Sequence, residues 1–398
     1  MMLRNFGPGL LVAAAFVGPG TIVTASRAGA GYGTALLWAV VFSAVATAVL
    51  QEMAARIGLV TRKGLSEAIR ESFSKPVLRF LSLGLVAVAI TLGNAAYETG
   101  NLLGASLGLE ILSGVSPRFW AVAIAVAAVA LLLSGAYRMI QRVLIGLVVL
   151  MSFVFLVTAI LVEPSLAELG RGLVPSVPDG SVLTIVALIG TTVVPYNLFL
   201  HASTVQEKWP ADMKTDEALE QSRLDTALAV GLGGLVTVAI LVNATAFDDA
   251  SSLSAIASQL EPVLGDWAGA FFGLGLFAAG LTSSITAPLA AGYAMSGVLG
   301  WERDLKSPGF RAVVAFVVLT GLVLALIGGS PTEAIVIAQA ANGLLLPLIA
   351  IFLIVVVNDR ALMGEFRNRP LQNLLGVLVV LVVTGLGLYQ LLGVFGAV

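Results

Sequence analysis

The side chains able to do chemistry in this sequence are few. Its 398 residues contain no cysteine and one histidine, His201. Thiol catalysis and cysteine-ligated metal are therefore excluded, and a lone histidine cannot complete the HExxH pattern of zinc hydrolases. We expect a protein that is not an enzyme and that carries no cofactor.

One acid stands out by its position. Glu98 lies well inside an apolar stretch, and an ionisable group at membrane depth is a functional hypothesis by default. It could hold a proton or attract a cation, or it could form a structural ion pair with Arg311. His201 could titrate near neutral pH and move a proton, although a lone histidine can also serve only in packing.

A run of hydroxyl residues offers a possible ion site. The stretch "LTSSIT" at 281–286 places Thr282, Ser283 and Thr286 on one predicted helix. Together with backbone carbonyls, these hydroxyls could hold sodium. The alternative is that serine and threonine donate to carbonyls of their own helix, as they commonly do.

The elements that position these residues are predicted to be membrane spans. The chain is 58% hydrophobic and 11% charged, whereas soluble domains are about 25% charged. Uncharged runs of roughly 18 to 25 residues can cross a hydrocarbon core as helices. We count eleven such runs, at 9–30, 34–57, 77–107, 118–136, 140–163, 181–205, 224–246, 265–299, 309–329, 332–357 and 373–396.

The joints between spans predict the orientation. Of 21 lysines and arginines, only Arg27, Arg118 and Arg171 fall in joints that face outside when the N-terminus is cytoplasmic. The positive-inside rule therefore predicts a cytoplasmic N-terminus and an outside C-terminus. The polar joints 206–226 and 64–73 read as short helices and are too short for a soluble signalling domain.

Two spans carry breaks that define a candidate site. The first holds Gly18-Pro19-Gly20 and the sixth holds Pro195, 195 − 19 = 176 residues later. Proline removes a backbone donor and glycine permits turning, so both spans should be interrupted. Corresponding broken helices in two halves indicate a transporter's central site. We expect one transmembrane domain over 1–398, with five-helix repeats at 1–163 and 175–358 and an extra helix at 370–398.

Longer stretches give the sequence a family resemblance. It resembles the Nramp family of metal-ion transporters in order and spacing of these stretches: "GPGLLVAAAF", "AGAGYGTALLWAVV", "QEMAARIGLVTRKGLSEAIRE", "VVPYNLFLHAS", "LEPVLGDWAGAFFGLGLFAAGLTSSITAPLAAGYAMSG" and "NDRALMGEFRN". The resemblance implies an all-α LeuT-like fold, in which spans 1–5 and 6–10 are inverted repeats, helices 1 and 6 are broken, and transport proceeds by alternating access.

The resemblance fails at the residues that would bind metal. The family's aspartate and asparagine at the first break fall on Gly18 and Thr21, and its methionine and alanine at the second fall on Val194 and Thr191. Further replacements are Tyr196 for a histidine, Asn101 for one of two span-three acids, and Leu281 for a glutamine, whereas the family's other histidine and acid remain as His201 and Glu98.

These replacements change the expected substrate. A dehydrated divalent ion needs carboxylate or several strong oxygens, and thioether ligands favour transition metals. Thr21 contributes one hydroxyl, and carbonyls near Phe16, Val17 and Val193 would add only neutral oxygens. We therefore expect a transporter of a partly hydrated divalent cation such as magnesium, or alternatively of a small polar organic solute such as an amino acid, amine or organic acid, with sodium or proton coupling open.

The expected site combines the breaks with polar residues of neighbouring spans. Its substrate-binding members are Gly18, Gly20, Thr21, Thr191, Val194, Tyr196, Asn197, Gln339 and Asn342, with Asn94 and Tyr97 nearby; Glu98, His201, Thr282 and Ser283 are the candidate ion-coupling residues. The expected partners are a small ion or molecule and the lipid bilayer, without nucleic acid. We expect a monomer in the cell (inner) membrane.

Overall fold

The computed structural model describes residues 17–134, 137–247, 252–327 and 330–394, and these contain helices and no strand. The expected run 9–30 begins outside the described residues. Phe16, whose carbonyl is one of the expected neutral oxygens, also lies outside them. Each of the other ten expected runs contains one long helix, or two in the case of 181–205. Ten segments of the described chain are long and apolar enough to span a membrane, the first of them joining α2 to α3.

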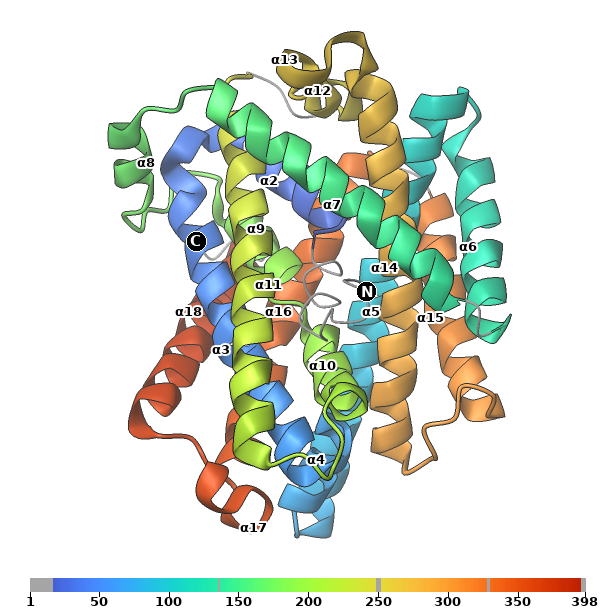
Figure 1. Ribbon diagram of the computed structural model, residues 1–398, viewed down its shortest axis with the longest axis vertical. Coiled ribbons are helices and arrows are strands. Elements are labelled where there is room, and N and C mark those ends of the chain that lie inside the picture. The colour runs from blue at the N-terminus through green and yellow to red at the C-terminus, as the bar shows by residue number, and fades with distance from the viewer. Residues whose placement is uncertain (1–16, 135–136, 248–251, 328–329, 395–398) are drawn as a thin grey trace.

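The helices follow one another along the chain as shown in Figure 1. Their bounds are α2 Pro19–Tyr32, α3 Leu37–Thr61, α4 Leu65–Ser72, α5 Pro76–Ser113, α6 Pro117–Ser134, α7 Tyr137–Leu161, α8 Leu166–Gly172, α9 Val182–Thr192, α10 Pro195–Lys208, α11 Thr215–Ala244, α12 Leu253–Ser258, α13 Glu261–Leu264, α14 Ala268–Leu299, α15 Pro308–Leu326, α16 Pro331–Asn358, α17 Arg360–Met363 and α18 Pro370–Val394, with 3₁₀ turns η2 Gly33–Leu36, η3 Gly265–Trp267 and η4 Gly364–Phe366.

Proline and serine mark where several helices begin. Proline opens α2, α5, α10, α15 and α16, where its missing N–H costs no helical hydrogen bond. Ser307 and Ser330 precede α15 and α16, and each accepts a backbone N–H from the first turn. These local signals fix the helix ends that surround the site.

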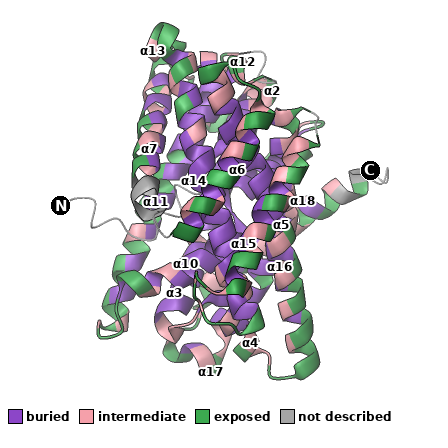
Figure 2. Ribbon diagram, turned by 90° about the vertical axis from the view of Figure 1, so that its right-hand side faces the viewer, coloured by how far each residue is buried: buried purple, intermediate pink, exposed green. Residues whose placement is uncertain are grey.

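The long helices form one bundle with short elements at its ends. The elements α8, α12 and α13 lie at one end and α4 and α17 at the other (Figure 1). Buried residues occupy the middle of the bundle and exposed ones its rim (Figure 2). Large apolar side chains such as Val126, Ile160 and Leu228 are exposed on that rim. An apolar exterior is what a bilayer requires, and we interpret the rim as facing lipid.

Small residues let the central helices approach closely. Gly108 of α5 faces the Gly273 carbonyl of α14, and Gly280 of α14 faces Ala105 of α5, with no room for added side-chain atoms. Close backbone approach through small residues is the usual way for membrane helices to associate. Helix α5 is thereby held in the centre, next to the breaks.

Candidate functional site

The two predicted breaks lie side by side. Helix α2 begins at Pro19 after an extended Gly18 (φ −103°, ψ −174°). Helix α9 ends at Thr192, and Val193 and Val194 are non-helical before α10 begins at Pro195. The Oγ1 atoms of Thr21 and Thr191 are 2.9 Å apart, and both residues are fully buried. A single hydroxyl pair thus connects segments 170 residues apart in sequence.

Neighbouring helices close tightly around this pair. A Cβ atom added at Gly20 would overlap the carboxamide of Gln339, and one added at Gly104 would overlap the Pro19 ring. The absence of a side chain at these two glycines therefore lets α16 and α5 reach the first break. Gln339 and Asn342, three residues apart on α16, both lie in this buried region.

Aromatic residues line the second break. The rings of Tyr97 and Tyr196 meet edge to face with centroids 5.3 Å apart and an interplanar angle of 80°. Tyr97 also lies beside Thr191. The Tyr196 hydroxyl is buried and has no hydrogen-bond partner among the described residues. The replacement of the family's histidine therefore brings a neutral hydroxyl into the interior.

Several further polar groups in this region are buried and unpartnered. Within the described chain, no partner is found for either side-chain atom of Asn197, for Nδ2 of Asn94 and Asn342, or for Oε1 of Gln339. A buried polar group without a hydrogen bond costs about 1–3 kcal/mol. Native proteins usually satisfy such groups with protein, water or ligand, so these groups are candidates to contact a polar guest.

Two backbone carbonyls at the breaks accept hydrogen bonds from the helices that follow them. The Gly18 carbonyl accepts the Ile22 N–H at 3.2 Å, and the Val194 carbonyl accepts the Asn197 N–H at 3.1 Å. The side chain of Val194 is buried and supplies no ligand atom.

Glu98 is fully buried on α5. Asn101 donates its Nδ2 to Glu98 Oε2 at 3.2 Å, while Oε1 has no partner within the described chain. Ser284 of α14 lies beside Glu98, and Gly321 of α15 packs against its Cβ and Cγ atoms. The anticipated pair with Arg311 is wrong for the described residues: Arg311 is exposed and makes no ion pair, because it lies at the start of α15 whereas Gly321 contacts Glu98.

His201 has a partner that the sequence did not single out. Its Nδ1 lies 2.8 Å from Oε1 of Gln51 on α3, and both residues are buried. Because this oxygen only accepts, Nδ1 is the donor in this contact, and Nε2 has no partner among the described residues. A glutamine within an apolar span was the available signal for this partner.

The hydroxyls of α14 divide between two roles. Thr282 donates to the Ala278 carbonyl at 2.7 Å and Thr286 to the Thr282 carbonyl at 2.8 Å, as in the helix-capping alternative. Ser283 Oγ is buried and has no partner in the described part of the chain. Leu281 is also buried, and it stands where the resemblance implies a glutamine, so this turn has no carboxamide at that position.

The described residues show neither a metal cluster nor a hydrolase turn. Within ranges 17–134, 137–247, 252–327 and 330–394, no three His, Cys, Asp or Glu residues gather as metal ligands. Residues 104–108 read Gly-Ala-Ser-Leu-Gly, yet they lie inside α5, and Ser106 donates to the Leu103 carbonyl at 2.8 Å. A hydrolase nucleophile instead sits on a sharp turn between strand and helix.

Comparisons with known proteins agree with this architecture. Residues 9–393 match the family model "Natural resistance-associated macrophage protein-like", Nramp. The divalent metal cation transporter MntH of Yersinia pestis (strain Pestoides F) is 30% identical over 400 residues, covering 98% of this chain and 95% of the relative.

Solved structures support the fold. A mutant of the Eremococcus coleocola manganese transporter superposes with a TM-score of 0.80 at 23% identity, covering 98% of this chain and 87% of that one. MhsT in complex with L-phenylalanine gives a TM-score of 0.62 at 15% identity, covering 98% of both chains. At these identities the likeness shows the fold alone, and it confirms the LeuT-like class expected from the sequence.

Proposed function

The chain belongs to the Nramp family, and from this premise we propose that it is an alternating-access membrane transporter whose central site carries a partly hydrated divalent cation. The site is formed by the breaks at Gly18–Thr21 and Thr191–Asn197, together with Gln339 and Asn342. Relatives named as divalent metal and manganese transporters support the ion class. The changed lining supports the hydrated form of the ion.

The hydroxyl pair of Thr21 and Thr191 carries this proposal. Both oxygens are fully buried, and they meet where the two breaks meet. They present neutral oxygen where a tightly coordinated ion would need carboxylate, so a cation at this point keeps part of its water shell. Magnesium gives up its water reluctantly and commonly binds in this way.

Glu98 supplies the negative charge that such a site needs. It is buried and has an unpartnered oxygen within the described chain, and its neighbour Tyr97 contacts Tyr196 of the second break. In its charged form it attracts the cation toward the breaks, and in its protonated form it carries a proton instead. Coupling to protons would use Glu98 and His201, whereas coupling to sodium would use Thr282 and Ser283.

A small polar organic solute is the second candidate. The unpartnered Nδ2 groups of Asn94, Asn197 and Asn342 are hydrogen-bond donors. A bare cation accepts no hydrogen bond, whereas a carboxylate or carbonyl group does. The N-terminus of α2 at Pro19 also suits an anionic group, because the helix dipole is positive there.

The first test is isothermal titration calorimetry of the purified protein with magnesium and manganese. We expect magnesium binding that Thr191→Val weakens about tenfold or more. The control is Thr192→Val, at the next residue, because Thr192 Oγ1 donates to the Leu188 carbonyl of its own helix at 3.0 Å. We expect that control to change affinity less than twofold.

Two other results would decide against the leading proposal. Micromolar manganese binding would contradict the loss of the dehydrated transition-metal site. No response to either metal, with a thermal shift produced by an amino acid, amine or organic acid, would favour the second candidate. We expect the double variant Gly18→Asp, Thr21→Asn to gain manganese affinity, because it adds a carboxylate and a carboxamide oxygen at the break.

A further inference from the structure

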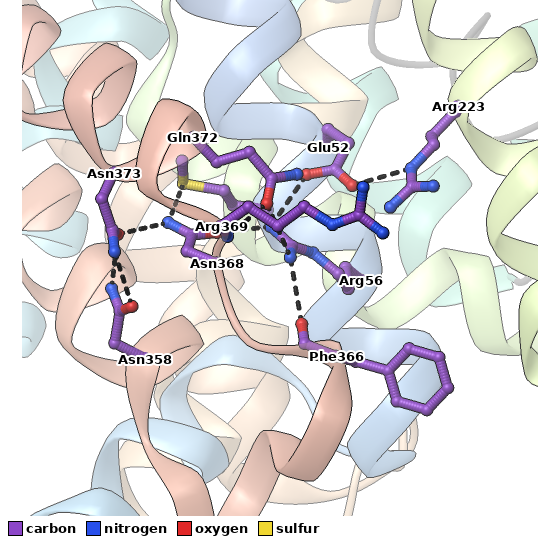
Figure 3. Close-up of polar contacts among 10 residues, drawn as sticks. Glu52, Arg56, Arg223, Asn358, Phe366, Asn368, Arg369, Gln372 and Asn373 are labelled. Carbon is purple, nitrogen blue, oxygen red and sulfur yellow. Dashed lines mark hydrogen bonds and ion pairs between the residues drawn. The ribbon is translucent and has the colours of Figure 1, made fainter.

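A polar network fixes one end of α3 to the segment before α18. Arg56 is only 2% exposed and donates to the Phe366 carbonyl (3.0 Å), Asn368 Oδ1 (2.6 Å) and Glu52 Oε2 (3.0 Å), as Figure 3 shows. These bonds direct the Arg56 guanidinium at protein acceptors. Its role is therefore to hold the segment in place.

Amide pairs make the start of α18 similarly fixed. Asn358 and Asn373 exchange two hydrogen bonds of 2.7 and 2.9 Å, and Asn368 donates to Asn373 at 2.8 Å (Figure 3). The chain on either side of Arg369 is thus tied to the end of α16. Any groove beside this segment is preformed, which lowers the entropic cost of filling it.

Such a groove of about 260 Å³ opens between three helices. Its walls come from α3, α11 and α18 and consist of Ala48, Val49, Glu52, Met53, Arg223, Gln372 and Leu375. Charged and amide groups thus share the groove with aliphatic side chains. Gln372 accepts the backbone N–H of Arg369 at 2.8 Å, which places the backbone of this exposed arginine beside the groove.

Positive charge predominates at the polar side of the groove. Arg223 is 52% exposed and shares Glu52 with Arg56, at 3.0 Å from each. Arg369 pairs with no carboxylate of the described chain. Arg223 and Arg369 thus add two exposed positive charges beside the Glu52–Arg56 pair, as Figure 3 shows. Glu220, one turn before Arg223 on α11, makes no ion pair with it in the described structure. A charge of this sign at a membrane edge favours an anionic ligand.

Apolar surface continues from the groove along the same helices. Val45 of α3 lies about two turns before Glu52, and Leu228 of α11 lies just over one turn after Arg223. Both side chains are largely exposed, Leu228 by 66%. The groove therefore joins a cationic end to an aliphatic surface, which matches a lipid better than a soluble anion.

We propose that this groove binds an anionic phospholipid. Arg223 and Arg369 hold the headgroup phosphate, for which the planar guanidinium is well suited. Ala48, Val49 and Leu375 cover the glycerol region, and an acyl chain lies along the exposed faces of α3 and α11. This proposal is independent of the transported substrate.

Native mass spectrometry of the full-length protein in detergent tests the proposal. The probes are phosphatidylglycerol, phosphatidylcholine and glycerol 3-phosphate. We expect retention of phosphatidylglycerol over phosphatidylcholine, reduced about fivefold by either Arg223→Gln or Arg369→Gln and by roughly twentyfold in the double variant. Both side chains are substantially exposed, so folding should be preserved.

The control is Arg311→Gln, an exposed arginine at the start of α15 and outside the groove lining. It should leave the preference for phosphatidylglycerol unchanged. Equal retention of the two lipids, or equal retention by wild type and the double variant, would overturn the proposal. Glycerol 3-phosphate binding as strongly as the lipid would also overturn it, because the aliphatic surface would then contribute nothing.

Discussion

At the residue scale, the buried surroundings of the two breaks carry several neutral polar groups within an otherwise apolar core. Thr21 and Thr191, which are predicted to stand at family ligand positions, contact each other, while Tyr196 and Asn197 carry unpartnered groups in the described interior. Neutral groups cost less to bury than charges but still need hydrogen-bond partners. This pattern accounts for a site that favours a guest with its own hydrogen-bonding capacity.

The buried pair of Gln51 and His201 leads to a stability prediction. Gln51→Leu leaves Nδ1–H of His201 without an acceptor and should lower the free energy of unfolding by about 1–3 kcal/mol. The double variant Gln51→Leu, His201→Leu removes both polar partners and should recover part of this loss. Chemical denaturation in detergent of Gln51→Leu, His201→Leu and the double variant measures the coupling between the two residues. A double variant whose loss of unfolding free energy equals the sum of the two single losses would contradict the prediction.

At the element scale, the first break depends on one close contact. Gly104 of α5 lies against the Pro19 ring, and neither a proline ring nor a packed helix can move aside easily. Gly104→Ala should therefore destabilise the protein by about 1–3 kcal/mol and impair transport.

The matched control for that substitution is Gly84→Ala on the same helix. An added Cβ there meets no atom within 4 Å, so the variant should be neutral or more stable, since alanine favours helix over glycine. Thermal unfolding and substrate uptake by reconstituted vesicles check both variants. Equal effects at Gly84 and Gly104 would show that the Pro19 contact is not the cause.

The short helix α4 joins distant elements at one end of the bundle. Glu67 pairs with Arg303 at 2.7 Å, Arg70 donates to the Val298 carbonyl, and Ser72 donates to Asp359 at 2.7 Å. These contacts link α4 to the end of α14 and to the residues that follow α14 and α16. We expect α4 to hold that end of the bundle together.

Breaking one of these links should open that end more often. The native chain has no cysteine, so Ser203→Cys, beside Gly64, provides a single thiol for labelling. We expect Glu67→Gln to raise its labelling rate by up to about fivefold, since a partly exposed ion pair contributes up to about 1 kcal/mol. Glu71→Gln, which breaks only the local Lys63–Glu71 pair, should not raise the rate. Identical labelling rates for Ser203→Cys alone, with Glu67→Gln and with Glu71→Gln would rule out this role.

At the scale of the whole molecule, the bundle is an integral membrane transporter fold with an apolar rim. Counted by length and hydropathy, four segments from α2 to α7 precede five from α9 to α16, and the first of the four joins α2 to α3. We propose repeats at 1–163 and 175–358 with α18 added. The proposed orientation places the N-terminus in the cytoplasm and the C-terminus outside.

The orientation can be tested because the chain lacks native thiols. Asp179 and Asp212 are both exposed and lie in joints on opposite sides of the predicted membrane. A membrane-impermeant maleimide should label Asp179→Cys in intact cells and Asp212→Cys only after permeabilisation. The reverse pattern would invert the topology.

Local composition determined the class of this protein. Long uncharged runs predict membrane helices, and Gly18-Pro19-Gly20 and Pro195 predict interruptions at the positions where α2 and α10 begin. Proline alone does not decide a break, since Pro288 and Pro347 lie inside α14 and α16. The replacement of family metal ligands at Gly18 and Val194 rests on residue identity alone and stays a prediction.

Only the tertiary structure decided which groups meet. The pairs Thr21 with Thr191, Gln51 with His201 and Arg56 with Asn368 join residues 150 or more positions apart. The same packing leaves Arg311 exposed and Glu98 without a cation in the described chain. The physical reason is that helical pattern fixes which face of a helix is buried, whereas the partner of each buried group depends on how the helices pack against one another.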